Sequence, residues 1–363
     1  MKIVVVTSVF PPSIGGVQTH VYELARAMAA KGHQVRVISK SDGQIFNSEE
    51  FLEKVRIQWI GSSNLRYLYY YQLNKFLKKL IAKKECDVIH VHGMRPLKAC
   101  VNQGVPIIFT NHTSSFLKHL QTGGRHLQRL RQVLQGVDKV LAPSTELVDA
   151  TLQVGYEGPT EYIPNGVDVN KFYPAKSELR KQLGIPDSAF VIILARRLVD
   201  KNGTLYMAEA MKNIQHSDIH LIVAGDGEQK QQFENIINKG HHPKNVHMLG
   251  FVLNSEMTPV YQAGDICVLP SLMEATSITG LEAMATGLPL IGTRVGGIPD
   301  LIDEGNTGLL IEPRSPEQIQ NAVEQLYRQR ELTDKMKTQS VERAHKNFTW
   351  ETIAARTVQA YEV

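Results

Sequence analysis

One stretch of the chain, residues 265–300, restricts the possible folds more than any other. Its apolar run at residues 265–270 predicts a buried strand, and a loop with Glu274 leads from this strand into a helix that ends before Gly287. A second apolar run follows, and then a turn at Gly296 and Gly297. Two strands joined through a helix pair in parallel, so the stretch predicts a βαβ unit of an α/β fold.

The helix of this unit begins at a loop, which predicts an anion-binding site. Thr276 or Ser277 can cap the helix, and the backbone amides of Ser277, Ile278 and Thr279 are expected to face a ligand. Because the helix dipole is positive at this end, a phosphate is favoured there.

Two carboxylates lie on either side of those amides. Glu274 precedes the helix, whereas Glu282 lies inside it, about 7.5 Å further along the axis at about 1.5 Å per residue. With a diphosphate on the amides, the two carboxylates can accept hydrogen bonds from the sugar and from the ribose of a nucleotide sugar. In the alternative interpretation, Glu274 only stabilises the helix dipole and Glu282 is an exposed surface acid.

The Glu-x7-Glu spacing is followed by Ala-Met-Ala-x-Gly-x-Pro and Gly-Gly-Ile-Pro-Asp, a pattern that resembles the signature of the family 4 retaining glycosyltransferases. The resemblance implies the GT-B fold, in which two Rossmann-like doubly wound domains face a central cleft. It also implies metal-independent transfer of a hexose from a nucleoside-diphosphate sugar to a hydroxyl, with retention of configuration. One departure is Ala275-Thr276-Ser277 in place of the family's frequent Gly-Phe-Gly, which leaves less room near the donor sugar and keeps its identity open.

The length of 363 residues exceeds what one hydrophobic core usually holds, so the chain predicts two domains. The turn Pro164-Asn165-Gly166 predicts a hinge between them. We expect an N-terminal acceptor-binding domain at residues 1–168 and a C-terminal nucleotide-sugar-binding domain at residues 169–345. The resemblance implies that a helix within residues 346–363 crosses back to the first domain.

A basic loop follows the predicted strand at residues 190–195. Cations after a parallel strand lie at the edge where α/β sheets bind ligands. The family pattern is Arg-Leu followed by Lys-Gly, and it implies a clamp for the diphosphate as negative charge develops on the leaving group. Arg197 matches through Arg197-Leu198, and Lys201 lies one residue before the place that Asn202 occupies. We assign the clamp to Arg197 and Lys201, with Arg196 as the alternative.

The resemblance also assigns residues outside these loops. Gly16 belongs to a loop that covers the donor phosphates in the family, and His112 matches a Thr-x-His that faces the donor sugar. Gly225 matches a turn beside the nucleotide, and Phe251-Val252 matches the base-binding stretch and favours UDP over GDP. The predicted catalytic residues are Glu274, Arg197, Lys201 and His112, and the predicted donor-binding residues are Gly16, Arg196, Gly225, Phe251, Val252, Ser277, Ile278, Thr279 and Glu282.

Composition excludes several other classes of protein. The formal charge of +4 is small for this length and no long basic block occurs, so no nucleic-acid partner is expected. The dispersed Cys86, Cys100 and Cys267 predict reduced core residues. We expect no metal, because no Cys-x-x-Cys or Asp-x-Asp motif occurs at a suitable place. We expect no dinucleotide cofactor, because the turn at Gly15 and Gly16 lacks the Gly-x-Gly-x-x-Gly fingerprint.

A basic and aromatic segment at residues 64–84 predicts a helix that can lie on an anionic membrane. The alternative is an ordinary packed helix with a solvated lysine face. The chain starts directly with a strand, without a signal peptide, and no apolar run reaches the roughly 18 residues that span a bilayer. We therefore expect a cytoplasmic protein, with peripheral contact at the inner face of the membrane as an option.

The resulting hypothesis is a retaining glycosyltransferase of bacterial glycoconjugate or polysaccharide synthesis that uses a UDP-sugar such as UDP-glucose or UDP-GlcNAc. Its hydroxyl acceptor has no recognisable motif, and a lipid-linked acceptor is one option. Two alternatives are a UDP-sugar epimerase or phosphorylase of the same fold, and a non-catalytic sugar-binding module. An epimerase needs proton-shuttling groups in place of an acceptor site, and a binding module would not turn over its ligand.

Overall fold

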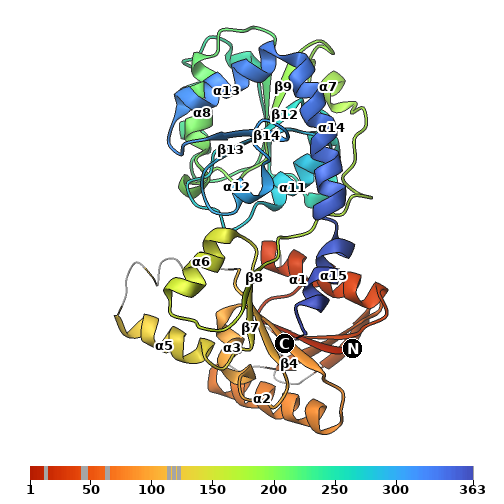
Figure 1. Ribbon diagram of the computed structural model, residues 1–363. Coiled ribbons are helices and arrows are strands. Elements are labelled where there is room, and N and C mark those ends of the chain that lie inside the picture. The colour runs from red at the N-terminus through yellow and green to blue at the C-terminus, as the bar shows by residue number, and fades with distance from the viewer. Residues whose placement is uncertain are drawn as a thin grey trace. The chain divides into compact units, whose positions relative to one another are not determined.

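The computed structural model describes residues 1–11, 15–41, 48–61, 66–112, 116, 120 and 124–362. The chain divides into two compact units (Figure 1). Unit 1 contains Met1–Gly166 together with the C-terminal stretch that begins at Trp350, and unit 2 contains Val167–Thr349. The sequence had predicted boundaries after residues 168 and 345, which differ from Gly166 and Thr349 by two and four residues.

Unit 1 is built on one eight-stranded sheet with the strand order β3-β4-β2-β1-β5-β6-β7-β8. All neighbouring strands are parallel except β3 and β4. The strands are β1 (Lys2–Thr7), β2 (Gln34–Ser41), β3 (Ser48–Leu52), β4 (Val55–Gly61), β5 (Val88–His92), β6 (Ile107–Thr110), β7 (Lys139–Ala142) and β8 (Thr160–Tyr162).

Helices cover both faces of this sheet, because its central strands are apolar on both sides. The described helices of unit 1 are α1 (Gly16–Ala30), α2 (Arg66–Ala82), α3 (Met94–Cys100), α5 (Gly124–Leu134), α6 (Thr145–Gln153) and α15 (Trp350–Gln359). In β1, Ile3 and Val5 join a core with α1 and α15, whereas Val4 and Val6 join a core with α2, α3 and α5. This alternation follows from the two-residue period of a strand.

Unit 2 contains a six-stranded parallel sheet with the order β11-β10-β9-β12-β13-β14. Its strands are β9 (Phe190–Leu194), β10 (Ile219–Ala224), β11 (Val246–Gly250), β12 (Ile266–Leu269), β13 (Leu290–Thr293) and β14 (Gly308–Ile311). Its helices are α7 (Leu179–Gln182), α8 (Thr204–Asn213), α9 (Lys230–Ile237), α10 (Met257–Gln262), α11 (Ile278–Ala285), α12 (Ile298–Leu301), α13 (Pro316–Arg328) and α14 (Arg330–Asn347), with 3₁₀ turns η1 (Asp200–Asn202), η2 (Pro243–Asn245) and η3 (Asn254–Glu256).

Each sheet has one point at which the strand order reverses. In unit 1 the chain builds outward from β1 on one side and continues from β5 on the other, and in unit 2 the same reversal occurs between β9 and β12. Ligands of open parallel sheets bind beyond the carboxyl ends of the strands at such a point. The α/β architecture with two parallel-sheet domains confirms the predicted fold class, and it indicates where each unit would bind a ligand.

Two smaller expectations concern single residues and membranes. Cys86, Cys100 and Cys267 are free and buried, as predicted. None of the helices in the described part of the chain combines the length and the apolar character needed to cross a bilayer.

Candidate functional site

The site in unit 2 lies where β9 and β12 end side by side. Arg196 follows β9, and Glu274 lies in the loop after β12. The Arg196 Nη1 atom lies 2.6 Å from the Glu274 Oε2 atom, and its Nη2 donates to Ser277 Oγ at 3.0 Å. Both charged side chains are mostly buried, with exposed fractions of 10% for Arg196 and 17% for Glu274.

Two polar atoms of this site have no hydrogen-bond partner among the described residues. They are the Nε atom of Arg196 and the Oγ1 atom of Thr276, and both are buried. Buried polar atoms in proteins are nearly always hydrogen-bonded, so the unpaired Nε–H of Arg196 is available to a ligand or to an ordered water.

Helix α11 presents free backbone amides at the same place. Ser277 is its cap, since Ser277 Oγ accepts from the Gly280 amide at 3.1 Å. The first bond inside the helix runs from the Leu281 amide to the Ser277 carbonyl, so the amides of Ile278 and Thr279 have no acceptor within the helix. These two amides and the unpaired Nε–H of Arg196 are hydrogen-bond donors that suit a phosphate.

Two glycines allow the backbone to come close at this site. A Cβ atom on Gly225 would lie 1.9 Å from the carbonyl oxygen of Arg196. Gly296 has φ +59°, and a Cβ atom there would lie 1.4 Å from the carbonyl oxygen of Glu274. Both positions therefore require glycine, and the predicted nucleotide-side turn at Gly225 also supports the backbone of Arg196.

Glu282 lies inside α11 and is 6% exposed. Asn254 Nδ2 donates to its Oε1 atom at 2.7 Å, and the Tyr261 hydroxyl donates to its Oε2 atom at 2.8 Å. Burial raises the pKa of the Glu282 carboxyl, and these two hydrogen bonds act against that shift. The alternative of an exposed surface acid is wrong for Glu282, because the carboxylate belongs to a buried polar network.

The structure places the basic loop in a different register from the sequence expectation. Arg196, not Arg197, lies beside Glu274, and Arg197 is exposed. Successive side chains at a strand end point to opposite sides, so only one of the two arginines can lie over the point where the strand order reverses. The side chain of Lys201 is exposed, but its carbonyl accepts from the amides of Leu272 and Met273 in the loop that carries Glu274.

The predicted base-binding residues follow the edge strand β11. Phe251 is 68% exposed, and Val252 packs against the core of unit 2. The amide of Gly225 donates to the carbonyl of Gly250 at 2.7 Å, which places the turn after β10 next to the turn after β11. Asn254 and Tyr261, which hold Glu282, were missed because no local motif marks a contact between η3, α10 and α11.

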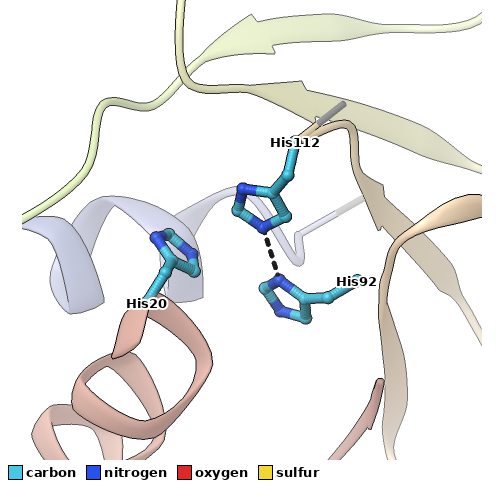
Figure 2. Close-up of side chains that lie close together, drawn as sticks. All are labelled: His20, His92 and His112. Atoms are coloured by element: carbon cyan, nitrogen blue, oxygen red, sulfur yellow. Dashed lines mark hydrogen bonds between the residues drawn. The ribbon is translucent and has the colours of Figure 1, made fainter. Parts of the chain in front are cut away.

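The site in unit 1 is a group of histidines at the carboxyl ends of β5 and β6. Figure 2 shows His20 of α1, His92 at the end of β5 and His112 just after β6 gathered around one point. His92 Nδ1 and His112 Nε2 lie 2.8 Å apart, and the rings of these two residues are stacked with centroids 5.1 Å apart. His20 Nδ1 contacts Asn165 Oδ1 at 2.6 Å.

A fourth histidine supports this cluster from the strand below. His90 lies two residues before His92 and therefore on the same face of β5, with ring centroids 4.1 Å apart. Its Nε2 contacts Thr110 Oγ1 at 2.6 Å, and its Nδ1 contacts the Tyr361 hydroxyl at 2.8 Å.

Burial keeps all four imidazoles neutral. It lowers the pKa of His20 to about 4 and that of His90 to about 3, and it lowers the pKa values of His92 and His112 well below their ordinary value. In the described part of the chain, His20, His92 and His112 are also the one group of histidine, cysteine or acidic residues in which three potential metal-binding atoms lie within 4.8 Å of one another.

The sequence had assigned only His112 of this cluster to the site, although His92 also ends a predicted parallel strand, at the edge where ligands bind. Gly16 is the exposed first residue of α1, and part of the loop before it, which the sequence placed over the donor phosphates, lies outside the described residues. His20 could have been suspected, because it falls next to Val21 and Leu24 on the apolar face of α1. The contribution of His90 and His92 required knowledge of which strands are neighbours.

Two family models match the chain and together span most of its length. The model of glycosyl transferases group 1 matches residues 175–343, and the model of Glycosyltransferase Family 4 matches residues 14–171.

Curated relatives match over nearly the whole chain. A D-inositol 3-phosphate glycosyltransferase from Arthrobacter sp. is 28% identical, over 96% of this chain and 90% of its own. The alpha-monoglucosyldiacylglycerol synthase of Acholeplasma laidlawii is 24% identical, over 85% of this chain and 84% of its own.

Solved structures share the fold. Sucrose-phosphate synthase from Thermosynechococcus elongatus superposes with a TM-score of 0.80 at 23% identity, covering 99% of this chain and 98% of its own. Anabaena HepE in complex with UDP superposes with a TM-score of 0.81 at 20% identity, covering 99% of both chains. A second structure of HepE contains UDP-glucose.

Proposed function

Because the chain belongs to the family 4 glycosyltransferases, we propose that it transfers a sugar from a UDP-sugar to a hydroxyl acceptor with retention of anomeric configuration. The observation that carries this proposal is the arrangement at the point where the strand order of unit 2 reverses. There the Arg196 guanidinium, the free amides of α11 and the Glu274 carboxylate converge. An anion and a polyhydroxyl group are the ligands that this combination suits.

In unit 2 we assign the diphosphate to the α11 amides and to the guanidinium of Arg196, which takes the place of Arg197. Lys201 completes the clamp, since its backbone is tied to the Glu274 loop and its exposed side chain is free to reorient toward a phosphate. Negative charge increases on the diphosphate as the glycosidic bond breaks, so fixed cations stabilise the transition state more than the bound donor.

The two carboxylates are assigned to the two ends of the donor. Glu274 accepts hydrogen bonds from hydroxyls of the transferred sugar, and Glu282 accepts from the ribose. Each carboxylate oxygen has two lone pairs, so Glu282 can bind ribose while it keeps its bonds from Asn254 and Tyr261. Phe251 and Val252 form a wall for the base.

Retention then proceeds without a covalent intermediate. A retaining glycosidase uses a free carboxylate nucleophile about 5 Å from its acid partner. Here Glu274 is paired with Arg196, and both oxygens of Glu282 are held by protein donors. We therefore propose that an oxygen of the departing diphosphate takes the acceptor proton and that the acceptor attacks from the same face. No metal is required for this step.

The relatives and neighbours support the choice of substrates. HepE structures contain UDP and UDP-glucose, which supports a UDP-sugar donor. The name of the Acholeplasma relative includes diacylglycerol, which supports a lipid-linked acceptor. The exposed lysines of α2, Lys75, Lys78 and Lys79, are consistent with such an acceptor, because no acidic residue accompanies them between residues 66 and 84.

A transfer assay with defined donors tests the proposal. Purified protein is incubated in EDTA with UDP-glucose, UDP-GlcNAc or the corresponding GDP-sugars, in the presence of lipid and sugar acceptors. We expect a product with the anomeric configuration of the donor, as given by proton coupling constants in the NMR spectrum. Inversion would contradict the retaining mechanism, and turnover that returns only with magnesium or manganese would contradict metal independence. Conversion of the donor sugar without an acceptor would favour the epimerase alternative.

A further inference from the structure

The histidine cluster of unit 1 contains enough hydrogen-bond partners to assign where its protons lie. Because burial keeps the four imidazoles neutral, each ring has one N–H donor and one lone pair. His20 illustrates the assignment. Its Nδ1 contacts Asn165 Oδ1, an oxygen that can only accept, so His20 carries its proton on Nδ1.

His92 and His112 share one proton across the 2.8 Å contact between His92 Nδ1 and His112 Nε2. Two arrangements are possible. Either His92 donates from Nδ1 and keeps a bare lone pair on Nε2, or His112 donates from Nε2 and His92 keeps an N–H on its own Nε2.

The surroundings of His92 Nε2 distinguish the two arrangements. This atom is buried and has no hydrogen-bond partner in the described part of the chain, and His92 is 1% exposed. A buried N–H without an acceptor is rarer in proteins than a buried acceptor without a donor. The favoured arrangement therefore leaves the lone pair on Nε2 and has His92 donate from Nδ1.

This choice determines what His112 can do. With Nε2 occupied as an acceptor, the neutral ring must carry its proton on Nδ1. Figure 2 shows the second nitrogen of His112 on the side of the ring away from His92. His112 is only half-buried, and no described residue accepts a hydrogen bond from its Nδ1. It is thus a neutral donor that a ligand oxygen can reach.

We propose that His92 is a positioning residue that holds His112 in the Nδ1–H tautomer, so that His112 donates a hydrogen bond to an oxygen of the substrate. The proposal rests on the glycosyltransferase function for its substrate, but the tautomer itself is a property of the unliganded protein. His92 does not contact substrate. Its role is to fix the direction in which His112 donates, as a metal-bound or catalytic histidine is fixed by the partner of its other nitrogen.

The same three histidines have the residue types of a zinc site, and one distance argues against that use. Two nitrogens bound tetrahedrally to zinc at about 2.0–2.1 Å lie about 3.3 Å apart. The 2.8 Å between His92 Nδ1 and His112 Nε2 is shorter than this and matches a hydrogen bond.

Nitrogen NMR of protein labelled with ¹⁵N-histidine tests the tautomer directly, because protonated and bare imidazole nitrogens differ strongly in chemical shift. We expect His112, assigned by its loss in His112→Gln, to show a protonated Nδ1 and a bare Nε2 at neutral pH. A protonated Nε2 in the wild-type protein would overturn the proposal without any variant. A stoichiometric shift of the His20, His92 and His112 signals together on addition of zinc would overturn it in favour of a metal site.

The variant His92→Leu tests the positioning role. This variant removes the His92 N–H that donates to His112 Nε2, so we expect His112 to lose its preference for the Nδ1–H tautomer. We expect kcat to fall about two- to tenfold, the range for one lost hydrogen bond, with a smaller change in KM. His220→Leu is the matched control, because it removes a similar contact, His220 Nδ1 to His247 Nε2 at 3.1 Å, near the opposite ends of strands in unit 2. An unchanged His112 tautomer and kcat in His92→Leu would overturn the role. If wild-type protein transfers no sugar yet shows the Nδ1–H tautomer, the proposed function fails and the His92–His112 assignment stands.

Discussion

Both units gather polar side chains at the point where the strand order of their sheet reverses, but the two groups differ in charge. In unit 2 the group consists of an ionised pair, Arg196 and Glu274, next to the amides at the start of α11. In unit 1 it consists of four imidazoles that burial keeps neutral. The same topology therefore places groups of different electrostatic character at the carboxyl ends of the strands.

The difference in charge between the two groups determines how each group is stabilised in the unliganded protein. A partly buried guanidinium is destabilising without a carboxylate partner, so Arg196 and Glu274 neutralise each other, while the unpaired Nε–H of Arg196 stays available to an anion. Neutral imidazoles need no counter-ion and can hydrogen-bond to one another in a dry interior. We infer that unit 2 recognises the charged part of the substrate and that unit 1 recognises uncharged hydroxyl groups.

Removal of the Arg196 cation from unit 2 is the strongest test of the inference that this unit recognises the charged part of the substrate. We expect Arg196→Ala to lower kcat by about 10²–10³, because one preorganised contact to the developing negative charge is lost. KM should change less, since the charge on the leaving group is greater in the transition state than in the bound donor. Initial rates over a range of donor concentrations give both constants.

Arg197→Ala is the control for this measurement. Arg197 is exposed and follows Arg196 directly, so its removal changes the net charge equally without touching Glu274. It should keep most of its activity. If Arg197→Ala is inactive and Arg196→Ala is nearly normal, Arg197 binds the diphosphate, as the family pattern implies, and our assignment to Arg196 is wrong.

Alanine variants of the two carboxylates of unit 2 should differ in their effects, one on UDP affinity and the other on turnover. We expect Glu282→Ala to weaken UDP binding by roughly 1.5–3 kcal/mol, the contribution of a hydrogen bond to a charged group, because Glu282 is assigned to the ribose. Glu274→Ala should leave UDP affinity nearly unchanged and lower turnover. Calorimetry with free UDP measures the first effect, and Glu282→Gln, which keeps the shape, controls for packing. Equal weakening by both alanine variants would contradict the assignment.

Much of the unit 2 site could be predicted from sequence, because its parts are close together in the chain. The βαβ unit from β12 to β13 contains Glu274, the cap Ser277 and Glu282 within nine residues, and helix geometry relates them directly. The choice between Arg196 and Arg197 could not be made in the same way. A shift of one residue at a strand end moves a side chain to the other face, and local sequence does not determine where the strand ends.

Most of the unit 1 site, apart from His112, could not be predicted, for a different reason. His20 lies in α1, His90 and His92 lie in β5, and His112 follows β6. Tyr361 of the C-terminal segment completes the cluster. Each histidine alone has an ordinary structural explanation, and only the sheet order brings them together. Asn165 is a similar case, because the sequence predicted it as part of a hinge turn, whereas its side chain also orients His20.

The neutral state of the unit 1 cluster predicts that acid destabilises this unit. Burial lowers the pKa of His20 from 6.5 to about 4, so between these values the unfolded chain binds more protons than the folded one. The contribution of neutral His20 to the free energy of unfolding is therefore present above pH 6.5, and it is lost progressively as the pH decreases toward 4. For His20 alone the loss from pH 7 to pH 5 is on the order of 1–2 kcal/mol.

Tryptophan fluorescence during urea unfolding measures this effect in unit 1 specifically, because both tryptophans of the chain, Trp59 and Trp350, belong to that unit. His20→Gln keeps a donor for Asn165 but does not titrate, so its stability should fall less on acidification. The pKa of the Glu282 carboxyl in unit 2 is raised, so the folded state holds this proton more tightly than the unfolded one. Acidification therefore stabilises unit 2 through Glu282, which is the opposite of its effect on unit 1 through His20. An acid-insensitive unfolding midpoint for unit 1 would show that the histidines are not held neutral.

The smallest expected effect concerns the outer surfaces of the two units. Helix α2 of unit 1 has exposed lysines without acidic neighbours, whereas α14 of unit 2 mixes both signs, with Glu331 and Asp334 beside Lys335. If α2 contacts an anionic membrane, Lys78→Gln should weaken binding to vesicles of phosphatidylcholine and phosphatidylglycerol by about 1 kcal/mol, or about fivefold.

Lys335→Gln is the control for this measurement, because it removes the same charge from α14 and should have no effect. Because electrostatic attraction to lipid is screened by salt, the difference between the two variants should disappear at high ionic strength. Equal binding by the wild type and Lys78→Gln at low salt would instead identify α2 as a packed helix whose lysines only face water.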